Sequence, residues 1–267
     1  MNIFAISDPH LSFDETKPMN IFGSVWDNHW DDITKDWREK VSDDDIVLIA
    51  GDISWAMKLE DAKRDLELIG AEKGKKVLIR GNHDYWWSSY KKINEILPEG
   101  VYCLQNNAIK FGNVIICGTR GWSVPELGVE TDEHDLLLYA REKLRLELSL
   151  KEAKKLQEEG DIIIAMMHFP PFNSRYLSSH YTDLFKEYGV HSVVYGHLHG
   201  NSSRTIPVYE KQGIKYYLTS CDKLAKIAVI SRQAANDRRR NALLLHTSAY
   251  AFVIVIIHRS TSSSIRF

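Results

Sequence analysis

Six short apolar runs recur along the first two hundred residues, and five of them end in a histidine, an aspartate or an asparagine. Each run has four to six apolar residues and most are bounded by Gly or Asp, as is typical of buried sheet strands. Helix-like stretches at 58–70 and 134–160 lie between them, the second ending at Gly160 as a C-cap. This alternation predicts an α/β fold with helices covering a sheet. The runs occupy residues 2–7, 45–51, 75–81, 113–118, 161–168 and 191–197.

Polar side chains follow five of these runs at the point where each run ends. In α/β sheets the loops beyond the carboxyl ends of the strands form ligand sites, so we expect these side chains to converge on one edge. If these side chains were instead ordinary buried core residues, that explanation would have to apply separately to each of the five runs. The side chains are Asp8, His10, Asp52, Asn82, His83, Asp84, His168, His197 and His199.

The first of these clusters is Asp8-Pro9-His10. Residues two apart in an extended chain project to the same side, and Pro9 biases Asp8 away from helix. The tripeptide therefore predicts two metal ligands side by side on an extended segment. Taken alone, it is more typical of a strand end and a turn.

Length and charge limit the class of protein. A chain of 267 residues with 44% hydrophobic content allows one large α/β domain or two smaller ones. The net charge of -2 argues against a protein that coats nucleic acid. Residues 223–267 carry eight Lys or Arg against one acid, Asp237, which leaves the preceding body at -9. Such a body would repel phosphate-bearing substrates unless a local positive charge, such as bound metal, attracts them.

Cysteine usage and the N-terminus indicate the compartment. Cys103, Cys117 and Cys221 are widely spaced and lie in or beside apolar runs, so they are predicted to be buried thiols without disulfides. No signal peptide pattern precedes the first run. We expect a cytoplasmic protein.

Five motifs occur in order along the chain, and together they resemble a known family. The motif at 196–199, GHLH, is the most specific, because G-H-x-H is expected only about 0.03 times by chance in a chain of this composition. The chain resembles the calcineurin-like metallophosphoesterase superfamily over about residues 1–222, and more closely a compact, stand-alone bacterial member. The resemblance implies a four-layer α/β/β/α sandwich with two metal ions at the strand ends. The motifs are Asp8-Pro9-His10, Gly51-Asp52, Gly81-Asn82-His83-Asp84, His168 and Gly196-His197-Leu198-His199.

The same resemblance implies a set of metal ligands. Asp52 would bridge the two ions, each of its oxygens binding one. Imidazole and carboxylate ligands without thiolate favour Mn, Fe or Zn, whose identity the sequence leaves open. The first ion would be held by Asp8, His10 and His199, and the second by Asn82, His168 and His197.

The implied reaction is phosphoester hydrolysis in which a metal-bridging hydroxide attacks phosphorus in line with the leaving group. His83 would protonate the leaving alkoxide or stabilise charge, and Asp84 would hold His83 in orientation. The sequence lacks the Asp and Arg that follow Gly51-Asp52 in the phosphoprotein-phosphatase branch, so protein phosphatase activity is not expected. Arg175 is a candidate phosphate contact, although a surface position is the more frequent role for such an arginine.

Several other residues have two interpretations. Tyr85-Trp86-Trp87 either stacks on a planar leaving group or, as we favour, packs into the core at a helix start. Surface or packing roles are expected for the histidines outside the motifs, which are His29, His134, His180 and His191.

The tail at 223–267 lies outside the resemblance. Residues 241–257 carry no formal charge, but Asn241, His246, Thr247 and Ser248 make them a poor membrane span. The alternatives are a further strand, a poorly ordered tail, a frameshifted ending, or, less favoured, a segment that binds anionic membranes.

The leading hypothesis is thus a two-metal phosphoesterase acting on a small phosphoester or nucleotide-like substrate. The rivals are a nuclease or DNA-processing phosphoesterase, which should carry a basic groove, and a non-catalytic metal-binding scaffold, which should have lost ligands. The motifs do not separate monoester from diester hydrolysis, and the sequence does not indicate the oligomeric state.

Overall fold

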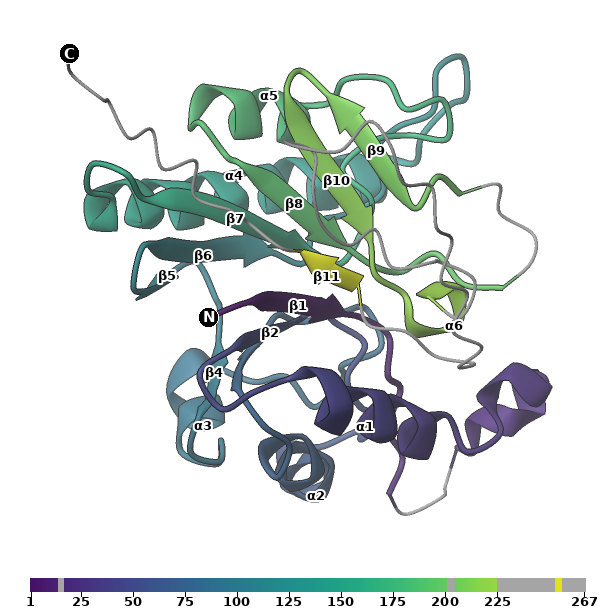
Figure 1. The fold of residues 1–267 in the computed structure, drawn as a ribbon. Helices are drawn as coiled ribbons and strands as arrows, with labels where there is room; N and C mark the ends of the chain where they lie inside the picture. The colour runs from purple at the N-terminus through teal and green to yellow at the C-terminus, as the bar shows by residue number, and fades with distance from the viewer. Residues whose placement is uncertain (14–16, 201–204, 225–252, 256–267) are drawn as a thin grey trace, which may run out of the picture.

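Two β-sheets packed face to face, with helices on both outer faces, make up the computed structural model (Figure 1). The structure describes residues 1–13, 17–200, 205–224 and 253–255. Three layers of buried apolar side chains separate the four layers of secondary structure. The predicted four-layer α/β/β/α architecture is therefore confirmed.

The first sheet has the strand order β11-β1-β2-β3-β4. Its first four strands in sequence run parallel, while β11 lies antiparallel to β1 and pairs Val255 with Ile3. The strands are β1 (Ile3–Ile6), β2 (Ile46–Ile49), β3 (Lys75–Leu78), β4 (Val101–Cys103) and β11 (Val253–Val255).

The second sheet has the order β5-β6-β7-β8-β10-β9. Its four central strands are parallel, and the two edge strands β5 and β9 pair antiparallel. The strands are β5 (Ala108–Phe111), β6 (Val114–Thr119), β7 (Ile162–Met167), β8 (Ser192–Tyr195), β9 (Val208–Lys211) and β10 (Ile214–Leu218).

The helices cover the outer faces of the sheets (Figure 1). On the first sheet these are α1 (His29–Lys40), α2 (Leu59–Gly70) and α3 (Tyr90–Asn94). On the second they are α4 (Glu133–Leu156) and α5 (His180–Glu187). Short elements are η1 (Met19–Phe22), η2 (Ser24–Trp26) and α6 (Cys221–Leu224).

Strand β1 shows why the apolar runs are continuous. Ile3 and Ala5 face the layer between the two sheets, whereas Phe4 and Ile6 face the layer under the helices. Since successive strand residues point to opposite faces, a strand covered on both sides must be apolar at every position. All six predicted runs contain strands, namely β1, β2, β3, β6, β7 and β8.

One predicted boundary is wrong. Helix α4 ends at Leu156 with Gln157 in extended conformation, four residues before the predicted end at Gly160. Asp161 explains the difference, because its carboxylate accepts a hydrogen bond from the Glu158 N–H over 2.8 Å and closes a separate turn. Gly160 has φ 84° within that turn.

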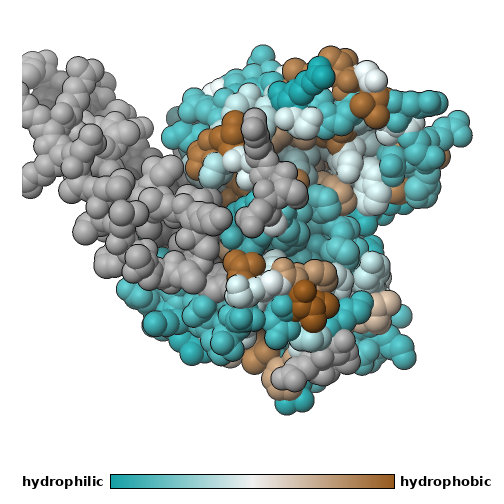
Figure 2. Space-filling model, turned by 90° about the vertical axis from the view of Figure 1, so that its right-hand side faces the viewer, coloured by the Kyte–Doolittle hydropathy of each residue, from teal (hydrophilic) through white to brown (hydrophobic). Residues whose placement is uncertain are grey.

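Two parts of the tail at 223–267 belong to described elements. Helix α6 spans the boundary predicted at 222/223, and β11 adds a strand beside β1. The other predictions for the tail lie outside the described residues. Within the described part of the chain, no helix is both long and apolar enough to cross a bilayer. The face seen in Figure 2 is mostly hydrophilic, with separate hydrophobic patches.

Candidate metal centre

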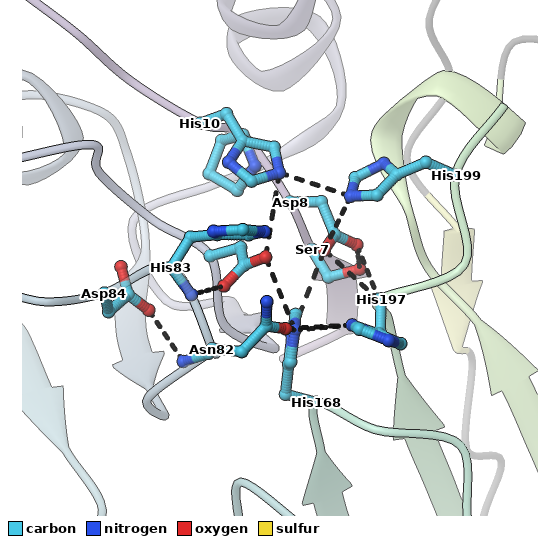
Figure 3. Close-up of polar contacts among 12 residues, drawn as sticks. Ser7, Asp8, His10, Asn82, His83, Asp84, His168, His197 and His199 are labelled. Atoms are coloured by element: carbon cyan, nitrogen blue, oxygen red, sulfur yellow. Dashed lines mark hydrogen bonds and ion pairs between the residues drawn. The ribbon is translucent and has the colours of Figure 1, made fainter. Parts of the chain in front are cut away.

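The carboxyl ends of β1, β2, β3, β7 and β8 meet at one end of the two sheets. Figure 3 shows the side chains that follow these strands surrounding a common space. The structure thus brings together all seven predicted ligands, which are Asp8, His10, Asp52, Asn82, His168, His197 and His199.

The first half of the site combines two imidazoles and two carboxylates. The Nε2 atoms of His10 and His199 lie 3.2 Å apart, and Asp8 Oδ1 lies 3.3 Å from His199 Nε2. One donor atom from each of Asp8, His10, Asp52 and His199 falls within 4.8 Å of the others. Nitrogen and carboxylate donors at this separation match the preference of divalent transition metals.

The second half is built around the amide oxygen of Asn82. This oxygen lies 2.6 Å from His168 Nε2 and 2.9 Å from His197 Nδ1. The two imidazole nitrogens are 3.3 Å apart. Asn82 is half-buried and His168 is fully buried. Three uncharged donor atoms therefore point at one place.

Asp52 lies between the two halves and faces both with one oxygen. Its Oδ2 atom is 3.7 Å from His10 Nε2 and 3.4 Å from His168 Nε2. Its Oδ1 atom instead accepts the His83 N–H over 2.7 Å. The expectation that each oxygen would take one metal is therefore not met by this geometry. Only Oδ2 faces the donor atoms of both halves.

The surroundings of Asp52 fit a cation. Oδ2 is buried and has no hydrogen-bond partner, which is costly for a carboxylate oxygen. Burial first, and then the negative charges of Asp8 and Asp84, raise the pKa of Asp52 to about 9. A positive ion between the two halves would supply the missing counter-charge for this carboxylate.

The backbone at the site is strained. Asp8, His10, Asp52 and His197 have φ values of 60°, 45°, 52° and 72°, in the left-handed region that non-glycine residues rarely adopt. Asp8-Pro9-His10 is therefore not extended, contrary to the prediction. Hydrogen bonds with the loop after β2 hold it, from Asp8 N to Gly51 O (2.9 Å) and from His10 N to Asp52 O (3.0 Å). Both side chains still reach the same space because the two loops are bonded together.

Two motif glycines are explained by close approach. A Cβ atom on Gly81 would overlap the backbone nitrogen and Oδ1 of Asp52. One on Gly196 would collide with Ser7 Oγ and lie 2.7 Å from Asp8 Oδ2. Since no side chain fits at either position, glycine lets the neighbouring strands bring the polar side chains together.

Second partners orient the imidazoles. His168 Nδ1 lies 3.0 Å from the Ala50 carbonyl oxygen, which leaves Nε2 free to bind a metal. His199 Nδ1 lies 3.6 Å from Asp222 Oδ1, while the other oxygen of Asp222 accepts the Gly200 N–H. Sequence reasoning missed Asp222, because it belongs to no motif and reaches His199 only through the fold.

Charge and burial act differently on these rings. Burial lowers the pKa of His199, but the Asp8 and Asp222 carboxylates outweigh it and raise the pKa to about 10. Burial dominates for the other half of the site, lowering the pKa of His168 to about 3 and that of His197 to about 4. The uncharged form of these two rings, which is the form that binds metal, is therefore favoured at neutral pH.

His83 stands beside the predicted ligands. Its ring centroid lies 4.6 Å from that of Trp55 and 5.7 Å from that of His10. The ring is half-buried, and burial lowers its pKa, so the neutral imidazole predominates at pH 7. His83 is thus placed to donate a hydrogen bond into the site (Figure 3).

Asp84 has a different function from the predicted one. Its buried carboxylate accepts four hydrogen bonds, none of which comes from the His83 ring. The donors are Ile53 N (2.8 Å), Ser54 N (3.1 Å), Gly81 N (2.7 Å) and Trp86 Nε1 (3.0 Å). Asp84 therefore joins the loop after β2 to the loop after β3, and so fixes Asp52 relative to Asn82.

Four other candidate residues lie outside the predicted ligand set. Arg175 is exposed, and no contact described in the structure joins its side chain to the site. Trp86 and Trp87 are buried in the core as favoured, but in a turn and not at a helix start, because α3 begins only at Tyr90. Tyr85 is 49% exposed, with its ring centroid 6.2 Å from that of His83.

The remaining histidines behave largely as expected. His134, His180 and His191 are exposed. His29 packs beside the site, with Nε2 lying 2.8 Å from the carbonyl oxygen of Pro9. His29 thereby supports the loop that carries Asp8 and His10.

Fold and site together define a metal-dependent phosphoesterase architecture. A family profile described as calcineurin-like phosphoesterase matches residues 1–201. The chain belongs to this family, which implies a phosphoric ester hydrolase with a binuclear divalent metal centre. No curated protein gave a significant match.

Solved structures are similar to this chain at low sequence identity. The protein TT1561 of Thermus thermophilus is similar with a TM-score of 0.53 and 14% identity, covering 81% of this chain and 87% of its own. Phosphopantetheinyl hydrolase (PptH) from Mycobacterium tuberculosis has a TM-score of 0.47 and 16% identity, covering 82% of this chain and 88% of its own. At 14% identity, the similarity to TT1561 supports the assignment of the fold and nothing more.

Proposed function

We propose that the protein hydrolyses a small phosphoester with two divalent metal ions. The observation that carries this proposal is Asp52 Oδ2, a buried carboxylate oxygen without a hydrogen-bond partner that faces donor atoms on both sides. Asp8, His10 and His199 would hold one ion, and Asn82, His168 and His197 the other.

The donor set limits the choice of metal. Imidazole nitrogen, carboxylate and one amide oxygen favour Mn, Fe or Zn over Ca or a thiolate-bound structural zinc. Two such ions would supply Lewis-acid activation of water near neutral pH and would neutralise phosphate charge. The protein's own contribution is to hold the ligands rigidly, through the Asp84 network and the carbonyl partner of His168.

His83 is proposed to assist the leaving group. Because burial lowers its pKa, its neutral ring would donate a hydrogen bond to a phosphoryl or leaving-group oxygen as negative charge develops there. Its position between Trp55 and Tyr85 supports this function, since aromatic rings exclude water from the donor.

The substrate is proposed to be a small phosphoester. Trp55 and the exposed Tyr85 lie beside the histidines and offer apolar surface to an organic leaving group. Arg175 remains a predicted phosphate contact on the loop that follows His168. We place the protein in the cytoplasm, which is supported by the three buried free thiols of Cys103, Cys117 and Cys221.

The test is a hydrolysis assay on metal-reconstituted protein. The substrates are a chromogenic phosphomonoester, the matching diester and cyclic nucleotides, and Asp52→Asn is the control variant. We expect metal-dependent hydrolysis by the wild type and a loss of at least about 100-fold in Asp52→Asn. If the wild type were inactive on the whole panel despite full metal loading, the proposal would be wrong.

A further inference from the structure

A second polar cavity lies outside the metal centre, where the ends of β3 and β6 approach helix α4. Its volume is about 80 Å³. Three of its lining residues are arginines, Arg80, Arg120 and Arg145, and its only acidic lining residue is Glu142. No residue of the metal centre lines it.

The charges in this cavity do not balance. Glu142 is fully buried and accepts hydrogen bonds from Thr119 Oγ1 and Arg145, each over 2.7 Å. Arg120 approaches the same carboxylate only to 3.7 Å. The lining thus contains three guanidinium groups and one carboxylate, a surplus of two positive charges. Arg80 and Arg120 are half-buried, and positive charge that is partly removed from water is stabilised by a counter-ion.

Two of the lining arginines also have an unpaired hydrogen-bond donor. The Nε atoms of Arg80 and Arg120 are buried, and neither has a hydrogen-bond partner among the described residues. Burial lowers the pKa of Arg120; Glu142 opposes this effect, and repulsion from Arg80 adds to it. A network that served only to stabilise the fold would be expected to pair these donors.

The chemistry of the lining selects a ligand class. Guanidinium groups bind phosphate and similar oxyanions through paired N–H groups. A cavity of this volume has room for several water molecules and therefore for a phosphate group. No His or Cys lines it, so a transition metal is not favoured.

The cavity is connected to the metal centre through the backbone. Arg80 directly precedes Gly81 and Asn82 in the loop after β3. The carbonyl oxygen of Arg120 accepts the N–H groups of His168 and Phe169, over 3.0 and 2.9 Å. A ligand held by the two arginines would therefore contact the segments that position Asn82 and His168.

We propose that this cavity is a second oxyanion site, separate from the metal centre, that binds a phosphate group. The group is either free phosphate or the terminal phosphate of a larger molecule. Because the cavity shares no lining residue with the metal centre, binding there does not require hydrolytic activity.

The test is calorimetric titration of inorganic phosphate into the full-length protein after removal of metal with a chelator. Arg80→Gln removes a cavity arginine that has no contact with Glu142 among those the structure describes. Ser88→Asp places a carboxylate on the cavity wall as an internal counter-ion, and it keeps the test usable if Arg80→Gln fails to fold. Arg141→Gln is the matched control, because Arg141 approaches Glu142 at 3.7 Å without lining the cavity.

We expect one phosphate per wild-type chain, with affinity at least about tenfold weaker in Arg80→Gln and Ser88→Asp and within about twofold of wild type in Arg141→Gln. A parallel titration with p-nitrophenyl phosphate distinguishes the two sources: it binds if the site takes a terminal phosphate, and it does not if the site takes only the free ion. Absence of phosphate binding after chelation, or equal affinity in wild type, Arg80→Gln and Ser88→Asp, overturns the proposal.

Discussion

The backbone N–H of His83 donates a hydrogen bond to Oδ1 of Asp52 over 2.7 Å. This bond occupies one carboxylate oxygen and turns the other toward both halves of the site. It also fixes the start of the loop that carries the His83 ring. One contact between two motifs thus sets both the bridging oxygen and the proposed hydrogen-bond donor.

Asp222→Ala is expected to weaken metal binding without unfolding the protein. Asp222 lies beside His199 Nδ1, and loss of such a partner typically costs about 10- to 100-fold in metal affinity. Metal titration of the chelated protein measures the effect. Asp183→Ala is the control, because Asp183 is exposed on α5; an equal loss in both variants would contradict the function assigned to Asp222.

Asp84→Leu is expected to destabilise the protein by roughly 3 kcal/mol or more. The substitution leaves three buried backbone N–H groups and the Trp86 indole N–H without acceptors, at about 1–3 kcal/mol for each unsatisfied group. Urea unfolding of chelated wild type and variant measures the difference. A change below about 1 kcal/mol would show that water replaces the carboxylate.

His29→Leu is expected to weaken metal binding by about two- to tenfold, because the hydrogen bond to the Pro9 carbonyl is lost and the strained loop gains freedom. Metal titration again provides the measurement. His134→Leu is the control, since His134 is exposed on α4. Unchanged affinity in His29→Leu would mean that the bonds to Gly51 and Asp52 are sufficient to hold the loop.

The chelated protein is expected to lose stability as the pH rises from 7 to 9. Folding raises the pKa of Asp52 from 3.8 to about 9 and that of His199 from 6.5 to about 10. Groups with a raised pKa stabilise the folded state when protonated, and this contribution falls as the pH rises toward the folded pKa. The His168 and His197 shifts act below pH 6.5 and do not oppose it.

Bound metal should remove the loss of stability between pH 7 and pH 9, because the metal replaces the protons on Asp52 and His199. The increase in Tm caused by metal should therefore be larger at pH 9 than at pH 7. Thermal unfolding with and without chelator at both pH values provides the measurement. A metal-induced increase that shrinks with pH would contradict the assignment of these two groups.

The sequence predicted the sheets and the place of the site because both depend on local pattern. Runs that are apolar at every position must be covered on both faces, and the polar residue that ends each run marks the strand's carboxyl end. Backbone conformation was not predictable in this way. Asp8 and His10 are left-handed because the neighbouring loop holds them, a constraint that the tripeptide itself does not contain.

The remaining features depend on contacts between distant segments. Asp222 lies 23 residues from His199 and belongs to no motif, so no local signal marks it. Asp84 was predicted from its neighbour in sequence, but it bonds to residues 30 and 31 positions away. The arginine cavity joins the loops after β3 and β6 to α4, and only the fold brings these segments together.

The most direct test of the metal centre is the metal content per chain of wild type and Asp52→Asn, measured by elemental analysis after reconstitution and gel filtration. The substitution replaces the carboxylate of Asp52 with a neutral amide. Either the amide NH2 group or an uncharged oxygen then faces the two halves of the site. We predict about two metal ions in the wild type and at most about one in Asp52→Asn. Two tightly bound ions in both proteins would contradict the bridging position of Asp52.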